Sequence, residues 1–446
     1  MKTKKKLLLV YPVNPRIHSY SLNKRFCMPP LGLGIIAALT PPTWDVILQD
    51  ENMKSFEFQD ADLVGITACT STATRAYEIA GMYRERGVPT VLGGMHASML
   101  PDEAQRYVDT VVLGEAESVW PALIADFEAG NIQQVYQGKR VEPDEMVQPR
   151  HDLFKSYLMG AIQTTRGCPY DCEFCACTVF YGNRYRQRPV NDVLDELEAV
   201  PQKWIFFAED NLVPYGKQAE ERAIQLFQGM IERKIKKKWT CYASMNFADN
   251  EQVLEAAAKA GCQAVILGIE AEDDAALGEM NKNLNIRIGV NNFEDIFRKI
   301  QKHGITVHGE FIFGLDSDTP EKLRRRTDYI LSSSIDVMEV SLLTPLPGTR
   351  LMKRLEEDKR LLFTDYPSDW DYYDMEQVTF EPALMSVDEF TSVTQECIRR
   401  LYSYRSLFSK FKKTLFNTHS LYNAIACVLL NYTHRKVLYD AFSKID

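Results

Sequence analysis

Short apolar segments alternate with amphipathic segments along most of the chain. In the first 130 residues the apolar segments expected to form strands are 7–10, 46–48, 63–67, 90–92 and 110–113. The segments between them have helical patterns, among them 34–39, 74–86 and 101–107. Strands that alternate with helices form a parallel sheet covered on both faces. The sequence therefore predicts an α/β domain of the Rossmann-like type, whose ligand binds beyond the carboxyl ends of the strands.

A second alternating series begins at residue 161. Its expected strands are 161–165, 204–208, 240–243, 264–268, 306–313 and 337–343. The helical patterns between them include 190–199, 219–233, 252–260 and 293–303. Six strand–helix units fit a partial or complete barrel of the TIM type, with its active site at the carboxyl ends of the strands.

The remaining segments define the expected domain limits. We predict an N-terminal domain at 1–135, a polar linker at 136–160, a barrel at 161–350 and a small, mostly helical region at 351–446. In the last of these, Ser386 is expected to cap a helix that runs to Tyr402, with Glu389 as its capping-box partner. No internal repeat or low-complexity tract is evident.

Three cysteines lie close together just after the first barrel strand. Cys168, Cys172 and Cys175 have the spacing C-x3-C-x2-C. Three thiolates on one tight loop can hold three irons of a [4Fe–4S] cluster, which leaves the fourth iron open to a small chelating ligand. A structural zinc site is the weaker alternative, because it uses four ligands, usually in two separated pairs. Nearby Cys177 does not complete a usual zinc pattern, and the other six cysteines are expected to be ordinary buried residues.

This cysteine motif, with the aromatic Phe174 before its last member, resembles that of the radical S-adenosylmethionine (SAM) superfamily. The resemblance implies that Cys168, Cys172 and Cys175 hold the cluster and that the open iron binds the amino and carboxylate groups of SAM. An electron from a reductant such as flavodoxin or ferredoxin then cleaves SAM to a 5′-deoxyadenosyl radical. Further SAM contacts are expected from Phe174 and from the later strand ends, at Glu209, Ser244, Asn246 and Glu270. The glycine-rich motif that often follows the second strand is replaced here by Glu209-Asp210-Asn211.

The N-terminal domain resembles the cobalamin-binding domain of the cobalamin-dependent radical SAM enzymes. Small residues and hydroxyls follow its strands, where the nucleotide tail of cobalamin needs room and hydrogen bonds. The implied contacts are Thr67, Thr70, Ser71, Gly93, Gly94, His96, Gly114 and Glu115. The D-x-H-x-x-G stretch that supplies a lower axial histidine elsewhere is absent, although His18 lies in the corresponding loop. We therefore expect cobalamin without a histidine ligand, and His96 near the edge of the corrin ring. The alternative is a Rossmann-like module that binds nothing.

Together the two resemblances imply a C-methyltransferase that acts on an unactivated carbon through the 5′-deoxyadenosyl radical and methylcobalamin. One alternative is a radical SAM cyclase or oxidative rearrangement enzyme with a tetrapyrrole or lipid substrate. A non-catalytic carrier or sensor of cobalamin or iron–sulfur clusters is another. A methylthiotransferase is disfavoured, because its second cluster needs three more cysteines and only Cys27 and Cys69 precede the barrel.

Charge and hydropathy limit the partners. A net charge of −9 gives no support for nucleic-acid binding. Apolar runs are too short for a membrane span, so a cytoplasmic protein is expected. From Gln395 to the end, nine Lys and Arg outnumber three Asp and Glu, and residues 406–430 mix Lys410, Lys412 and Lys413 with apolar side chains. Such a segment either lies on an anionic membrane, which suits a lipid or other small apolar substrate, or packs on the barrel with solvated lysines.

Overall fold

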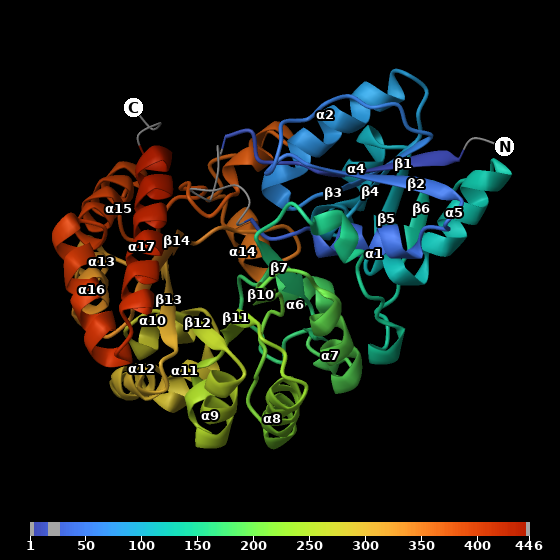
Figure 1. The fold of residues 1–446 in the computed structure, drawn as a ribbon. Helices are drawn as coiled ribbons and strands as arrows, with labels where there is room; N and C mark the ends of the chain where they lie inside the picture. The colour runs from blue at the N-terminus through green and yellow to red at the C-terminus, as the bar shows by residue number, and fades with distance from the viewer. Residues whose placement is uncertain (1–3, 17–26, 443–446) are drawn as a thin grey trace.

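The computed structural model describes residues 4–16 and 27–442. Two α/β units lie side by side, and a group of helices from the end of the chain packs on the second unit (Figure 1). His18 lies outside the described residues, so its predicted position in the first loop is not addressed by the structure.

The first unit is a six-stranded parallel sheet in the order β2-β1-β3-β4-β5-β6. Its strands are β1 (Lys5–Tyr11), β2 (Trp44–Asp50), β3 (Leu63–Thr67), β4 (Thr90–Gly93), β5 (Thr110–Leu113) and β6 (Val135–Gln137). Helices α1 (Leu31–Leu39) and α5 (Trp120–Ala129) cover one face. Helices α2 (Ala73–Arg84), α3 (Met95–Met99) and α4 (Pro101–Tyr107) cover the other. The strand order reverses between β1 and β3, which is where open α/β sheets form ligand crevices.

The sixth strand of this sheet was not predicted. The polar linker was expected from residue 136 onward, but residues 135–137 form β6, which pairs in parallel with β5. Only Tyr136 of its three residues is buried, so the apolar pattern is too short to be recognised in the sequence.

The second unit is a parallel sheet in the order β7-β10-β11-β12-β13-β14. Its strands are β7 (Met159–Ile162), β10 (Trp204–Phe207), β11 (Lys238–Ala243), β12 (Cys262–Glu270), β13 (Thr306–Phe313) and β14 (Val337–Leu342). The longer helices between them are α7 (Val190–Ala199), α8 (Lys217–Glu232), α9 (Glu251–Lys259), α12 (Phe293–Lys302) and α13 (Pro320–Ser332), and the shorter α10 (Asp274–Glu279) and α11 (Asn283–Ile288) lie between β12 and β13. β7 and β14 are not paired with each other, so this is the partial six-stranded barrel expected from the sequence.

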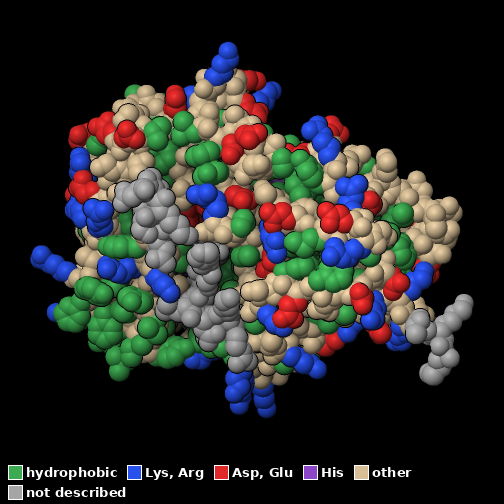
Figure 2. All heavy atoms as spheres, turned by 90° about the horizontal axis from the view of Figure 1, so that it is seen from above, with side chains coloured by type: hydrophobic (Ala, Val, Ile, Leu, Met, Phe, Trp, Pro, Cys, Tyr) green, Lys and Arg blue, Asp and Glu red, His purple; other side chains and the backbone are tan. Residues whose placement is uncertain are grey.

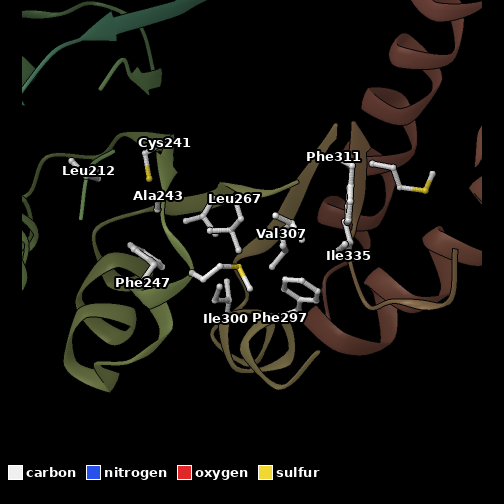
Figure 3. Packing of buried hydrophobic residues seen from close by; sticks show 14 of the residues in the cluster. Leu212, Cys241, Ala243, Phe247, Leu267, Phe297, Ile300, Val307, Phe311 and Ile335 are labelled. Carbon is white, nitrogen blue, oxygen red and sulfur yellow. The ribbon is translucent and has the colours of Figure 1, made fainter. Parts of the chain in front are cut away.

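Alternation along the barrel strands separates an outer apolar face from an inner face. Val307 of β13 and Leu267 of β12 pack against Phe297 and Ile300 of α12, as Figure 3 shows. These four side chains are fully buried. Because successive side chains of a strand point to opposite faces, the neighbours of Val307 point to the interior of the barrel. Polar residues can therefore occupy inner positions without disturbing the helix-packed core.

Three helices follow the barrel: α15 (Val387–Leu401), α16 (Tyr404–Thr418) and α17 (Leu421–Phe442). As predicted, Ser386 caps α15, because its side chain accepts a hydrogen bond from the backbone N–H of Glu389. Helix α17 lies across the amino ends of the barrel strands. Its Asn423 donates to the carbonyl of Gly304, before β13, and its Asn431 donates to the carbonyl of Asp336, before β14. None of the helices in the described residues is both long and apolar enough to cross a membrane.

The segment between β14 and α15, residues 343–386, joins the two units. Its Trp370 is 2% exposed, and the indole N–H of Trp370 donates to the carboxylate of Glu103 in α4 at 3.1 Å. Thr74 at the start of α2 donates to the carbonyl of Pro367, and Asn14 donates to that of Asp371.

Candidate functional site

The three clustered cysteines lie on the loop between β8 (Thr165–Arg166) and α6 (Ala176–Tyr181), at the carboxyl end of β7. All three are partly exposed and unpaired with other cysteines. Gly167 has a φ of +86°, and a Cβ there would lie 2.3 Å from the carbonyl oxygen of Arg184, so only glycine fits. Cys175 stands at the N-cap position of α6, and hydrogen bonding from Cys177 holds the pKa of the Cys175 thiol below its usual range. The loop thus presents three thiols to one region.

Charged contacts hold this loop against the rest of the barrel. Helix α14 (Arg350–Glu357) provides two arginines, of which Arg350 pairs with Asp171 at 2.7 Å and Arg354 with Glu173 at 2.9 Å. The backbone N–H of Glu173 also donates to the carbonyl of Met280. The position of the cysteines therefore depends on elements more than 100 residues away.

The residues expected to bind SAM meet at the same end of the barrel. Glu209 follows β10 and is 2% exposed, and Asn246 follows β11 and is 2% exposed. Ser244 precedes Asn246 and accepts a hydrogen bond from Asn211 at 2.5 Å. Phe174 lies on the cysteine loop and packs against the barrel core.

Several buried oxygens at these strand ends lack a hydrogen-bond partner among the described residues. They are Oε2 of Glu209, Oδ1 of Asn211 and Oδ1 of Asn246. Burial also raises the pKa of Glu209 to about 7. An unsatisfied buried polar atom costs about 1–3 kcal/mol, so such atoms are typical of ligand sites. The arrangement fits a ligand with hydroxyl or ammonium donors, such as the ribose and methionyl groups of SAM.

Glu270, the last residue of β12, has a backbone strain that the sequence did not reveal. Its φ is +68°, in the left-handed region that a residue with a Cβ rarely adopts. Its carboxylate pairs with Lys282 at 2.6 Å, and a Cβ on Gly268 would lie 2.5 Å from the Glu270 carboxylate. Strain of this kind persists where the surroundings fix a functional side chain. Lys282 was missed because it stands alone in a loop without a recognisable spacing.

The interior of the barrel contains further polar side chains. Tyr242 of β11, Glu310 of β13 and Glu339 of β14 all occupy inner positions and are partly exposed. Burial raises the pKa of Glu310 well above its usual range, and the charges of Glu339 and Glu270 raise it further. Tyr242 and Glu339 were missed by sequence reasoning, because each is a single polar residue within an apolar strand and belongs to no motif.

A cavity of about 360 Å³ lies between the two units. Thr67, Gly93, Gly94, Gly114 and Glu115 line it from the carboxyl ends of β3, β4 and β5. The second unit contributes Gln163, Arg166 and Ala208 to the same wall. The cavity therefore lies between the carboxyl ends of β1 and β3, where the strand order of the first sheet reverses, and Arg166, which precedes the cysteine loop.

Two glycines at the wall of this cavity leave no room for a side chain. A Cβ on Gly94, whose φ is +96°, would lie 2.7 Å from Oγ1 of Thr67, and a Cβ on Gly65 would lie 2.9 Å from Leu9. Between the sheet and helices α1 and α5 the cavity is lined mainly by apolar side chains, among them Ile36 and Trp120. A narrow apolar slot with hydroxyls at its mouth fits the nucleotide tail expected from the sequence.

Three of the expected cobalamin contacts lie elsewhere. Thr70 and Ser71 are in a short turn that does not line the cavity. His96 is 0% exposed, and its Nε2 lies 3.1 Å from both the Tyr77 hydroxyl and the Glu103 carboxylate. It packs edge-on against Trp370. The His96 side chain therefore belongs to the contact between the two units and not to the cavity, contrary to its expected place near a corrin edge.

Glu115 lines the cavity, but its carboxylate is engaged by two arginines of the second unit. Oε2 lies 2.9 Å from Arg166 and 2.9 Å from Arg186, and Oε1 pairs with Arg186 as well. The neighbouring Glu117 pairs with Arg166 at 2.6 Å. All four side chains are at most 7% exposed. Because Arg166 directly precedes Gly167 and Cys168, this buried network joins the first unit to the cysteine loop.

Comparison with known proteins identifies both units. Residues 162–330 match the Radical SAM superfamily, and residues 20–124 match the B12 binding domain. The chain is 30% identical to the bacteriochlorophyllide d C-12(1)-methyltransferase of Chlorobaculum tepidum, over 92% of this chain and 90% of that one. It is 28% identical to the hopanoid C-2 methylase of Rhodopseudomonas palustris, over 92% and 79%. Its fold is similar to the radical SAM methyltransferase TsrM of Kitasatospora setae, with a TM-score of 0.70, 16% identity and coverage of 97% and 99%.

Proposed function

Because this chain belongs to the radical SAM enzymes that carry a B12-binding domain, we propose that it is a C-methyltransferase that acts on an unactivated carbon. Its cofactors are a [4Fe–4S] cluster, SAM and cobalamin. Bound together, these supply a radical that removes a hydrogen atom and a methyl group that replaces it.

The cavity shared by the two units carries this proposal. It reaches from Gly94 at the end of β4 to Arg166 beside the cysteine loop, so ligands of both units can approach one another there. Cys168, Cys172 and Cys175 hold the cluster, while Glu209, Asn246 and Glu270 orient SAM. Thr67 and the glycines hold the tail of cobalamin, and the Glu115 network excludes water between the units. A flavodoxin or ferredoxin supplies the electron.

Methyl-labelled SAM tests the proposed reaction. Anaerobically purified enzyme, with reduced flavodoxin and an extract of the source cells, should transfer label to one small molecule and form 5′-deoxyadenosine. A cyclase or another oxidative enzyme would form 5′-deoxyadenosine and leave its product unlabelled, which would refute methyl transfer. A carrier or sensor would form neither product.

Replacement of Gly94 with alanine should weaken cobalamin binding. The new Cβ meets Thr67 Oγ1 and the Ala68 carbonyl at the cavity wall, and a φ of +96° with a ψ of −174°, a region essentially limited to glycine, adds about 1–3 kcal/mol of strain. We expect bound cobalamin, measured by its absorbance after gel filtration, to fall at least about 10-fold, the effect of about 1.4 kcal/mol. Gly130→Ala is the matched control, because Gly130 has a φ of +75° and open space around its Cβ position. Equal cobalamin content in the two variants would contradict the assignment.

For the substrate we propose a lipid or a similarly apolar molecule, drawn from a membrane surface. The relatives named above act on a bacteriochlorophyllide and on a hopanoid. Helices α16 and α17 also carry an exposed apolar face formed by Tyr404, Phe408, Phe416, Leu421, Tyr422, Ile425, Leu429, Leu430 and Tyr432. Figure 2 shows hydrophobic side chains gathered at its lower left, on the side where these helices lie. An apolar face of this extent is typical of an interaction surface.

The charges around this apolar face favour an anionic bilayer. Residues 404–439 contain six Lys and Arg and no Asp or Glu. Exposed Lys238 lies 4.1 Å from the ring of Tyr422, and Lys412 lies 4.4 Å from that of Phe408. The basic face differs from the one expected, because Lys410 is 1% exposed and donates to the carbonyls of Ile330 and Ser333 at the end of α13. Lys413 donates to neighbouring carbonyls of the same helix end.

Sedimentation with vesicles tests this surface. The protein should bind vesicles of phosphatidylglycerol and phosphatidylcholine more tightly than phosphatidylcholine alone, and Phe408→Ser with Phe416→Ser should weaken binding at least about 10-fold. Phe58→Ser is the control, because Phe58 is 44% exposed on the first unit. If the apolar face instead joins two copies of the chain, neither the wild type nor the variants will bind vesicles. The double variant will then have the lower molecular mass in solution.

A further inference from the structure

Two histidines and a glutamate meet at the amino end of the barrel interior. His308 is the third residue of β13, Glu339 is the third residue of β14, and His434 lies on α17. His308 pairs with Val337, which is two residues before Glu339, so His308 and Glu339 are diagonal neighbours on the inner face of the sheet. Helix α17 brings His434 to the same place from more than 90 residues further along the chain. None of the three residues belongs to the cysteine loop or to the cavity between the units.

The donor atoms of these side chains lie close enough to share one metal ion. Nε2 of His308 is 2.7 Å from Oε2 of Glu339, and Nδ1 of His434 is 4.0 Å from the same oxygen. One donor atom from each residue lies within 4.8 Å of the others. No other group of three His, Cys, Asp or Glu residues in the described chain meets that spacing.

The short contact between His308 and Glu339 is not a well-formed hydrogen bond. His308 Nε2 is buried and has no hydrogen-bond partner of acceptable angle among the described residues. A buried nitrogen without a hydrogen-bond partner is costly unless another group satisfies it, and a metal ion is such a group.

Neighbouring hydrogen bonds hold His434 in position. Asn431, one turn before it, accepts from the backbone N–H of Met338 at 2.9 Å and donates to the carbonyl of Asp336 at 2.9 Å. Arg435, directly after it, donates to the carbonyl of Tyr402 at 2.8 Å. These three bonds tie α17 to the start of β14 and the end of α15, so the histidine approaches Glu339 from a rigid element. Preorganised donors on rigid elements favour metal binding.

We propose that His308, Glu339 and His434 form a site for one divalent transition-metal ion, with zinc as its probe. Two imidazoles and one carboxylate are the ligand set of zinc sites that keep a fourth position open. Side-chain exposures of 13%, 33% and 21% show that the group is not sealed. A fourth ligand, water or an oxygen donor of a bound molecule, would complete the coordination.

Zinc content of the full-length protein tests the site. After anaerobic cluster assembly, incubation with zinc sulfate and gel filtration, we expect one zinc per chain in addition to the cluster iron. His434→Ala and Glu339→Gln should each weaken zinc binding at least 10-fold in competition with a chelating dye. His303→Ala is the matched control, because His303 pairs with Glu251 at 2.8 Å on the protein surface. Unchanged zinc content in His434→Ala would overturn the proposal.

X-ray absorption at the zinc edge separates this site from the cysteine loop. Ligands of nitrogen and oxygen at about 2.0–2.2 Å support the proposal, whereas sulfur at about 2.3 Å places the zinc on the cysteines and overturns it. Thermal unfolding of each variant without zinc shows whether the fold is retained, and His434→Asn provides a second variant of similar polarity. Zinc binding is measured without methyl transfer, so failure of this site and failure of the proposed reaction are distinguishable.

Discussion

Replacing Cys172 with alanine should abolish SAM cleavage. Cys172 is the middle member of the C-x3-C-x2-C loop, and two remaining thiolates cannot hold three irons of a [4Fe–4S] cluster. Because the cluster supplies the electron that cleaves SAM, the rate of 5′-deoxyadenosine formation should fall at least about 1000-fold. Iron analysis should show a fall from about four irons per chain to less than about one.

Two other cysteines serve as controls for this variant. Cys177 is partly exposed and lies beside Cys175, so Cys177→Ala tests whether it replaces a member of the motif. Cys241 is fully buried in the barrel core, and Cys241→Ala reports the effect of losing a thiol that packs without binding metal. Both should keep about four irons per chain. A Cys172→Ala enzyme with full iron content and SAM cleavage would refute the assignment of the cluster.

The fold could be predicted largely because its strands are buried on both faces. Leu7, Leu8, Leu9 and Val10 of β1 are all fully buried, and such continuous apolar runs are typical of parallel sheets. The edge strand β6 has no such run, and its position depends on pairing with β5. Residues 406–430 show a second limit of prediction from the sequence. Their composition indicated a basic amphipathic segment, but Lys410 is buried against the carbonyls at the end of α13, about 80 residues earlier.

The parts of the site that could be predicted are those whose function requires residues at a fixed spacing within a short segment. The cysteine loop and the glycines after β4 have backbone requirements that neighbouring residues reveal. Side chains whose partners are distant in sequence were not predictable. His96 was expected at the cavity, yet its partners Tyr77, Glu103 and Trp370 come from three other elements. Lys282 and Glu339 were missed for the same reason, because only the folded barrel brings them to their partners.

Replacing Glu115 with glutamine should weaken the contact between the two units. The Glu115 carboxylate is 2% exposed and neutralises Arg186, whose side chain is also 2% exposed. Removing one partner of a buried ion pair leaves the other charge uncompensated, which costs about 3–5 kcal/mol. Arg166 retains its ion pair with Glu117, so Arg186 is the arginine left without a carboxylate partner. We expect the free energy of unfolding to fall by about 3 kcal/mol in urea titrations of the transition that separates the units.

The dependence of this difference on pH gives a second measurement. Burial alone would raise the pKa of Glu115, but hydrogen bonding to Arg186 and the charge of Arg166 lower it below the usual range. A carboxyl group with a lowered pKa stabilises the fold above its unfolded pKa, near 4.3, and this stabilisation is lost as the pH falls through the folded value. The difference between wild type and Glu115→Gln should therefore be largest at neutral pH and shrink in acid.

A surface ion pair distinguishes this effect from a general loss of charge. Glu142 pairs with Arg184 at 2.8 Å, but their side chains are 49% and 67% exposed, so Glu142→Gln should leave the unfolding transition unchanged. Because Arg166 leads directly into Gly167 and Cys168, Glu115→Gln should also reduce the cobalamin and iron retained during gel filtration, and Glu142→Gln should not. Equal stability and cofactor content in the two variants would show that the buried network does not join the first unit to the cysteine loop.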